Sequence, residues 1–217
     1  MASPAAGQSA PAQQKKAAKD SKPKAAAGKD AKNGKGASKD AAKATGDRPA
    51  PGTPEHEEWL RVKYQILNMF GRNNEFPPKE TWKDYPPVTG RVMVEIASDA
   101  QSGQQHRVLA IHSLAHFPET PSAYNTCDAI ARSETETKFF RDAAMGCLVY
   151  GYPARAVPAL KEIASSGERG IQLSAVSGLT QLKTKEADAV LEKLLPGVSE
   201  PVARQMIEKR LKEARGG

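Results

Sequence analysis

Apolar residues recur along residues 90–214 at the spacing of buried helices. Four short stretches share one feature, a small or branched apolar residue four positions before a leucine. These pairs are Ala110 and Leu114, Ala144 and Leu148, Ala175 and Leu179, and Ile207 and Leu211. Such a pair, one helical turn apart, is typical of the buried stripe of a helix. The copies are 34, 31 and 32 residues apart, a period typical of stacked helical pairs.

The same pattern predicts an all-α fold of about four antiparallel helical pairs. The predicted helices cover residues 91–100 and 104–117, 120–132 and 133–151, 154–165 and 168–182, and 185–195 and 200–214. Ser133 and Glu136 have the spacing of a capping box, which predicts that a helix begins at Ser133. Pro158 has no backbone N–H and is expected in a first helical turn, which moves the start of its helix to near Val157. Short loops make consecutive helices antiparallel neighbours.

One more helix is predicted ahead of the repeats, from Thr53 to Gly71. Thr53 is suited to cap this helix and Pro54 suits its first turn. Apolar residues recur at helical spacing from Trp59 to Phe70. We expect this helix to cover the first pair as an N-terminal cap.

A connector rich in proline and aromatic residues follows at 72–88. Each of its two Pro-Pro pairs comes directly after an aromatic residue, which favours an extended backbone. Two interpretations stay open: Phe76, Trp82 and Tyr85 pack on the edge of the repeats, or they dock a partner. The chain therefore divides into a tail (1–52), the first helix with the connector (53–88) and the repeats (89–217).

The first 52 residues differ in composition from the rest of the chain. They contain ten lysines, one arginine and four aspartates but no aromatic residue, valine, isoleucine or leucine, and their net charge of +7 equals that of the whole chain. Such a segment buries too little apolar area to offset its chain entropy, so we predict a disordered basic tail. It is either a solubilising spacer or a polycationic arm that binds nucleic-acid phosphates without sequence preference. The lysines of that arm are Lys15, Lys16, Lys19, Lys22, Lys24, Lys29, Lys32, Lys35, Lys39 and Lys43.

The repeats resemble HEAT repeats, in particular the short bacterial HEAT-like kind named after phycobilisome lyases. The resemblance covers about residues 90–214 and is clearest at 156–164, which reads Ala-Val-Pro-Ala-Leu-Lys-Glu-Ile-Ala, followed by the stripe of Ala175 and Leu179. It implies a short α-solenoid of about four pairs. HEAT-like proteins mostly bind other macromolecules, and a minority resemble chromophore lyases or DNA glycosylases.

In that family the second helix of each pair carries an acidic residue, then an arginine, then the small core residue and the leucine. Arg107, Arg141 and Arg204 stand at the arginine position, and Glu168 and Glu200 stand at the acidic position. The chain departs from the pattern at Gln172, Gly103 and Thr137. These departures argue against a continuous acid–arginine ladder between the repeats but not against their stacking.

No convincing catalytic, cofactor or metal site is found in the sequence. His112 and His116 are one turn apart, but Ser113 stands where a zinc-protease motif has its glutamate. Cys127 and Cys147 lack the spacing of a metal or redox motif and are expected to be buried thiols, with a disulfide as the alternative. The chain is therefore predicted to be non-enzymatic, with no cofactor and no metal.

Apolar residues away from the buried stripe indicate a candidate binding surface. On the second helices they are Val108, Phe139, Val149 and Leu173, with His112 beside them. Either neighbouring helices cover them, or they form a shallow apolar groove for a partner helix. Together with Phe76, Trp82 and Tyr85 they are the candidate partner-binding residues.

The leading prediction is a protein-binding scaffold that uses the basic tail as a tether. The alternatives are a nucleic-acid-associated protein whose tail supplies the affinity and, third, an accessory of a lyase-type enzyme. No apolar stretch approaches the ~20 residues that cross a membrane, and no targeting signal is recognised. A cytoplasmic location is therefore predicted, whereas the oligomeric state is left open.

Overall fold

In the computed structural model, the described residues are 48–72, 75–166 and 168–216. All of them belong to the second of two compact units, Ala37–Gly217. Within those ranges the chain forms nine α-helices and three short 3₁₀ helices and no strand, which confirms the all-α prediction. The elements are α1 (Pro54–Arg72), η2 (Lys79–Trp82), α2 (Thr89–Ser98), α3 (Gln104–Ser113), η3 (Leu114–His116), α4 (Ala123–Arg132), α5 (Lys138–Gly151), α6 (Pro153–Ala164), α7 (Arg169–Leu182), α8 (Lys185–Leu194), η4 (Leu195–Gly197) and α9 (Pro201–Gly216).

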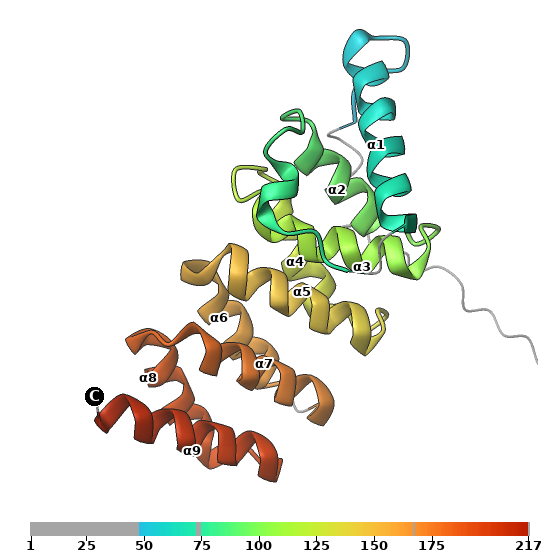
Figure 1. Ribbon diagram of the computed structural model, residues 1–217. Helices are drawn as coiled ribbons and strands as arrows, with labels where there is room; N and C mark the ends of the chain where they lie inside the picture. The colour runs from blue at the N-terminus through green and yellow to red at the C-terminus, as the bar shows by residue number, and fades with distance from the viewer. Residues whose placement is uncertain (1–47, 73–74, 167, 217) are drawn as a thin grey trace, which may run out of the picture. The chain divides into compact units, whose positions relative to one another are not determined.

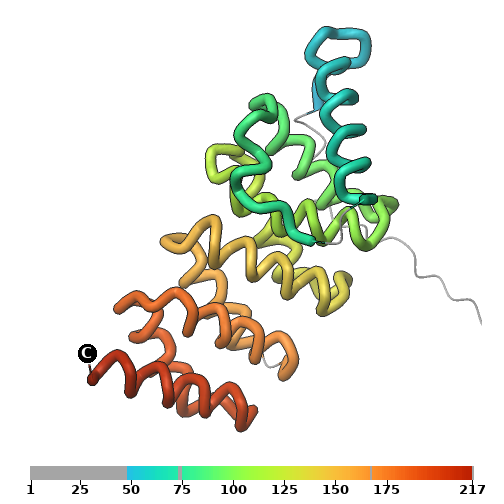
Figure 2. Tube along the Cα trace, in the orientation of Figure 1, coloured from blue at the N-terminus to red at the C-terminus, as the bar shows by residue number. Residues whose placement is uncertain are grey.

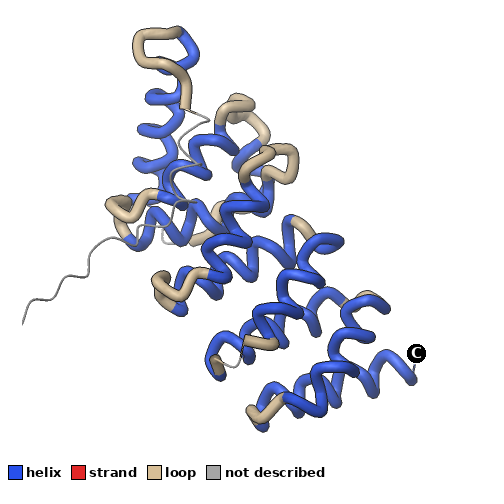
Figure 3. The backbone as a smooth tube through the Cα atoms, turned by 180° about the vertical axis from the view of Figure 1, so that it is seen from behind, coloured by secondary structure: helices blue, strands red, loops and turns tan. Residues whose placement is uncertain are grey.

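The helices form two layers of paired elements. Each pair consists of neighbours in the chain: α2 with α3, α4 with α5, α6 with α7 and α8 with α9. The second helices, α3, α5, α7 and α9, contact one another in succession and form one layer (Figures 1 and 2). The first helices, α2, α4, α6 and α8, form the other layer, and short loops join consecutive helices (Figure 3).

The core lies between these layers, where the repeated stripe places it. Its small residue and its leucine are fully buried in the first three pairs, as is Ile207 on α9, while Leu211 is 6% exposed. Small residues let neighbouring helices approach closely, and each leucine buried away from water contributes about 2 kcal/mol. The hydrophobic pattern therefore predicted the core correctly.

Helix α1 packs on α2 and α3, as expected of a cap. The Thr53 hydroxyl accepts a hydrogen bond from the His56 N–H at 3.2 Å, so Thr53 caps the helix. Trp59 and Phe70 are buried, and the Trp59 indole N–H donates to Glu95 on α2 at 2.7 Å. Lys63 also reaches Glu95, at 2.6 Å. A buried apolar face and two polar contacts thus fix α1 on the first pair.

Three predicted helix starts are wrong. Helix α4 begins at Ala123 and not at Thr120, because residues 121 and 122 form a turn. Helix α5 begins at Lys138, five residues after Ser133, because Glu136 pairs with a buried arginine of α3 instead of closing a capping box. Helix α6 begins at Pro153, so Pro158 is its sixth residue. The missing N–H of Pro158 leaves only the carbonyl of Ala154 without a helical partner, and Ala154 is exposed to water.

One side chain on each of α3, α5 and α7 bonds the end of the first helix of its pair, whereas Arg204 on α9 bonds the carbonyl of Val198, after η4. The guanidinium Nε of Arg107 donates to the Ala97 carbonyl at 3.2 Å, and that of Arg141 donates to the Ala131 carbonyl at 3.1 Å. The Gln172 amide makes the same contact with Ala164 at 2.9 Å. Carbonyls at a helix C-terminus lack partners within the helix, so this bond stabilises each pair.

The two arginines also reach the next pair. Arg107 forms two hydrogen bonds with the Glu136 carboxylate, at 2.6 and 3.2 Å, although only 7% of its side chain is exposed. Arg141 donates a single hydrogen bond to the Glu168 carboxylate, at 2.5 Å. Gln172 carries no charge for a third link, so among the described residues the ladder stops after two steps. This agrees with the departure that the sequence shows at Gln172.

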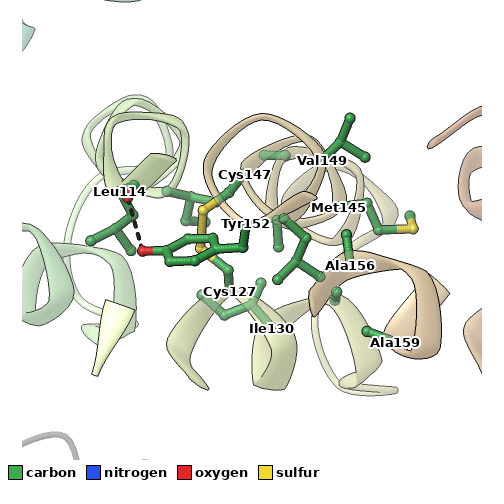
Figure 4. Close-up of a cluster of buried hydrophobic side chains, with 14 of the residues drawn as sticks. Leu114, Cys127, Ile130, Met145, Cys147, Val149, Tyr152, Ala156 and Ala159 are labelled. Atoms are coloured by element: carbon green, nitrogen blue, oxygen red, sulfur yellow. Dashed lines mark hydrogen bonds between the residues drawn. A yellow bond between two sulfur atoms is a disulfide. The ribbon is translucent and has the colours of Figure 1, made fainter. Parts of the chain in front are cut away.

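The two cysteines are joined in a disulfide, which corrects the expectation of buried thiols. Cys127 on α4 and Cys147 on α5 are fully buried, with their Cα atoms 6.4 Å apart (Figure 4). The bond ties together the two helices of one pair. Their separation of 20 residues matches no metal or redox motif, and only the packing of α4 on α5 brings the two sulfur atoms together.

The first and second pairs approach closely at the end of α5. A Cβ atom added at Gly151 would lie 2.6 Å from the Cα of Ala115, so only glycine fits there. The hydroxyl of Tyr152 donates to the Leu114 carbonyl at 3.2 Å (Figure 4), and burial raises the pKa of Tyr152 to about 12. These contacts join α5 to η3.

Candidate functional site

The first part of the connector lies along the surface of the first pair. The rings of Phe76 and His112 are stacked at a tilt, with their centroids 3.9 Å apart. One turn later, the His116 side chain forms a hydrogen bond with the backbone of Pro77. The two histidines therefore position the connector, with the Phe76 ring still 54% exposed.

Burial lowers the pKa of His112 from its ordinary value of 6.5. For His116 burial is also the main cause of a lowered pKa, followed by the charge of Lys79, while Glu80 and the bond to Pro77 act in the opposite direction. A lowered pKa keeps both rings neutral near pH 7. The described part of the chain holds no group of three or more histidine, cysteine, aspartate or glutamate residues placed to bind a metal ion.

The second part of the connector forms an aromatic cluster. Trp82 is 6% exposed and contacts Phe70, Tyr85 and Phe117 with centroid separations of 6.4, 5.4 and 5.6 Å, each edge to face. Such arrangements suit the charge distribution of aromatic rings. Trp82 therefore anchors the connector to α1 and to the first pair.

The exposed surface of α3, α5 and α7, here called the second-helix face, carries two large exposed aromatic side chains. Phe139 is 48% exposed and Tyr150 is 73% exposed, at opposite ends of α5. The Tyr150 hydroxyl donates to Gln181 on α7 at 3.1 Å. This bond orients the Tyr150 ring without covering it.

Charged groups are sparse on the second-helix face. Lys138 pairs with Asp142 at 2.5 Å and donates to Ser174 on α7 at 3.2 Å. Within α3, α5 and α7 the only other exposed charged residue is Arg169, at the start of α7, while Glu168 and Lys183 are exposed just beyond the two ends of α7. Between the two aromatic residues lies Gly146, where an added Cβ would be 3.5 Å from the His112 ring. Exposed charges on the second-helix face are therefore few.

The opposite layer has a different surface chemistry. Arg132 on α4 bonds both Asp128 on the same helix and Glu162 on α6, at 2.8 and 2.5 Å. The guanidinium of Arg155 lies 3.4 Å above the centroid of the Tyr124 ring. On this layer charged side chains thus pair with one another across helices or cover an aromatic ring.

The candidate partner-binding residues do not share one environment. Val108, Val149 and Trp82 are buried, at 7%, 8% and 6% exposure. His112, Leu173 and Tyr85 are half-buried, and Phe139 and Phe76 are exposed. Neighbouring helices cover the first three, so only the other five offer surface to a partner in this conformation.

Two exposed aromatic residues were missed by the sequence reasoning. They are Tyr150 and Tyr64, 73% and 71% exposed, and neither is among the predicted partner-binding residues. The one sequence feature that indicates their exposure is position: Tyr150 lies off the Ala–Leu stripe, and Tyr64 lies off the buried face of α1.

Most of the predicted tail lies outside the described residues, which begin at Arg48. The ten lysines proposed for polyanion binding, Lys15 to Lys43, all fall there. Among the helices that the structure describes, none has the length and apolarity needed to cross a membrane.

Comparison with known proteins leaves the family open. No protein-family model matches the chain, and a search of curated proteins gives no significant match.

Proposed function

We propose that the chain is a non-catalytic, protein-binding scaffold of the HEAT-like type, a short α-solenoid of about four pairs capped by α1. Two features support this assignment. The Ala–Leu stripe recurs at 31 to 34 residues, and the second helices contact one another in succession. Arg107 and Arg141, at the family's arginine position, link consecutive pairs through acidic residues.

The partner docks on the second-helix face. The observation that carries this proposal is the exposure of Phe139 and Tyr150 on a surface with few charges. Exposed aromatic side chains of this kind mark interaction sites, because a partner that covers them gains hydrophobic energy without having to desolvate many ions. An amphipathic helix fits such a surface, with an apolar stripe of residues spaced three and four apart that runs from one ring to the other.

Site-specific photo-crosslinking tests this assignment. A benzophenone amino acid replaces Tyr150 in one full-length variant and Phe139 in another, and in a control it replaces Asn125, which is exposed on α4. We expect one protein to be crosslinked from positions 150 and 139 and not from 125. Equal labelling from all three positions would contradict a partner on the second-helix face.

The basic tail favours a second candidate function, association with nucleic acid. The whole net charge of +7 resides in residues 1–52, and lysines on such a segment bind phosphates by releasing counterions. In the scaffold proposal the same segment is a tether. The cytoplasmic location stays a prediction, and the Cys127–Cys147 disulfide is the observation that favours an oxidising compartment instead.

A titration with single-stranded and double-stranded DNA and with RNA separates these two roles of the tail. The full chain is compared with a variant in which the ten tail lysines are replaced by glutamine, at low and near-physiological salt. If the tail binds nucleic acid, the affinity of the full chain falls steeply with salt and the variant loses it. Binding that survives the ten substitutions would exclude the tail as its source.

A further inference from the structure

A groove separate from the second-helix face runs between α1 and the end of the connector. It is open to solvent, has a volume of about 740 Å³, and is lined by α1 on one side and by residues 84–86 on the other. Helix α1 lies at one end of the helix stack (Figure 1), and no lining residue of the groove belongs to α3, α5 or α7. The scaffold function proposed above does not use it.

One stripe of α1 forms a wall of this groove. Arg61, Gln65, Asn68 and Arg72 line it, and their spacing of four, three and four residues places them on the same side of the helix. The stripe begins and ends with an arginine and carries two carboxamides between them. Carboxamides both donate and accept hydrogen bonds, so they suit the peptide groups of an extended chain.

Apart from Asp84, the rest of the groove is apolar and aromatic. Tyr64 rises from α1 with 71% of its surface exposed, and Pro86 and Tyr85 lie across from it. Tyr85 is half-buried, with its hydroxyl 4.0 Å from the sulfur of Met69. Grooves lined by aromatic side chains bind extended, proline-containing segments, because such segments lose little conformational entropy on binding.

The charges of the groove select an acidic occupant. Arg72 forms no ion pair with any described residue, and Arg61 has only an exposed contact with Glu58 at 3.4 Å, a kind of pair that contributes little. Asp84 is the single carboxylate among the lining residues. The chain's own tail carries ten lysines, so like charge disfavours it as the occupant.

We propose that this groove binds an extended, acidic peptide segment of a partner protein. Arg61 and Arg72 are 11 residues apart in the sequence, which is about 16 Å along a helix at 1.5 Å per residue. An extended chain covers that distance in about five residues. The segment therefore has two carboxylates about five residues apart, with apolar residues or proline between them to contact Tyr64, Met69 and Tyr85.

A labelled synthetic peptide tests the proposal on the full chain. The probe is Gly-Glu-Ala-Leu-Pro-Ala-Glu-Gly with rhodamine at its N-terminus, and binding is followed by fluorescence anisotropy at near-physiological salt. We expect Arg72→Glu to raise the dissociation constant at least tenfold, because it places a carboxylate opposite a carboxylate. Lys209→Glu on α9 changes the net charge equally, and Lys209 is exposed, so this control should change the constant less than twofold.

Two further measurements keep the outcome clear. A peptide with glutamine in both glutamate positions should bind at least tenfold more weakly than the probe, and circular dichroism checks that each variant keeps its helix content. If the probe does not bind, or if Arg72→Glu and Lys209→Glu weaken it equally, the groove is not its site and the proposal is wrong. A helical peptide with the same two charges that binds more tightly would also overturn the extended conformation.

Because the two surfaces are separate, this result and that of the crosslinking experiment are independent. Loss of peptide binding in Arg72→Glu leaves crosslinking from Tyr150 unchanged if both proposals are correct. A failure of either experiment therefore does not decide the other.

Discussion

The contacts between consecutive pairs differ along the stack although they use the same position of the second helix. Between the first and second pairs, and between the second and third, a buried arginine bonds a helix end and also pairs with a glutamate of the next pair. Between the third and fourth pairs, Gln172 makes only the first of these contacts. The fourth pair is therefore held mainly by its apolar stripe, which predicts lower local stability at α8 and α9.

The comparison teaches that the arginine position serves two separable purposes. The carbonyl at the helix end needs only an N–H donor, whether charged or neutral, so an amide can replace a guanidinium there. The link to the next pair requires a charge and a reach that glutamine lacks. Stacking persists without the link because α7 and α9 still bury Ala203, Ile207 and Leu179 between them and their neighbours.

The largest effect is expected when the first arginine is removed. Arg107→Ala leaves the Ala97 carbonyl and the partly buried Glu136 carboxylate without a partner and should destabilise the protein by about 3 kcal/mol. Gln172→Ala removes one neutral hydrogen bond and should cost about 1 kcal/mol. Urea denaturation at constant m-value measures both. Equal losses would show that the two positions do not differ as described.

The next effect concerns the close approach of the first two pairs. Gly151→Ala places a Cβ atom 2.6 Å from the Cα of Ala115, so α5 must shift, at a cost of about 2 kcal/mol. Gly197→Ala is the matched control, because nothing lies within 4 Å of a Cβ atom there. Thermal unfolding of the two variants checks the prediction. A melting temperature of Gly151→Ala equal to that of Gly197→Ala would contradict it.

A smaller, stabilising effect is expected when the missing link is restored. Gln172→Arg keeps a donor for the Ala164 carbonyl and adds a charge that can pair with Glu200, which is half-buried. Because this pair is only partly shielded from water, the gain should be about 0.5–1 kcal/mol. Hydrogen exchange should slow in α9 and stay unchanged in α3. Gln172→Lys, with the same charge but no planar fork, should give less of this protection.

The smallest effect is a dependence of local stability on pH, confined to the N-terminal part of the fold. All four histidines lie at or before residue 116, and burial lowers the pKa of His112 below 6.5 in the folded protein. The unfolded chain then binds a proton more readily than the folded protein does. Neutral His112 therefore contributes fully to the free energy of unfolding above about pH 6.5, and this stabilisation is lost as the pH falls through the folded-state pKa.

Hydrogen exchange at neutral pH and at about pH 5 measures this effect. Acid should increase exchange in α3 and leave the intrinsic-rate-corrected exchange of α9 unchanged. His112→Gln should reduce the change in α3, because that residue no longer titrates. An equal increase in α3 and α9 would contradict this prediction and would point instead to the protonation of carboxylates throughout the fold.

Some features of the fold follow directly from local spacing. The spacing of Ala144 and Leu148 predicted correctly that both are buried, because residues four apart lie on the same face of a helix in any surroundings. The cap formed by Thr53 and the start of α8 after Thr184, whose hydroxyl accepts from Ala187, are equally local. The prediction of a helix start at Ser133 failed for the opposite reason. Glu136 pairs with Arg107 on α3, 29 residues earlier. A capping rule considers only residues three apart, so it could not predict this contact.

The candidate site was predicted less completely than the core. Phe139 and Val149 both stood off the stripe in the sequence, yet Phe139 is exposed and Val149 is buried. The difference comes from neighbouring elements: a Cβ added at Gly178 on α7 would be 3.1 Å from Val149, so α7 lies directly over that side chain. Periodicity assigns each residue to a face of its helix, but the packing of the next helix determines which side chains on that face stay exposed.

The sequence by itself determined the all-α class, the buried stripe and the break in the arginine ladder at Gln172, because each of these depends on residue type and spacing within one or two turns. Only the tertiary structure decided that Cys127 meets Cys147, that Phe76 rests on His112, and that Arg61 and Arg72 face Tyr85 across a groove. These contacts join residues from different elements, and their geometry depends on how the helices pack.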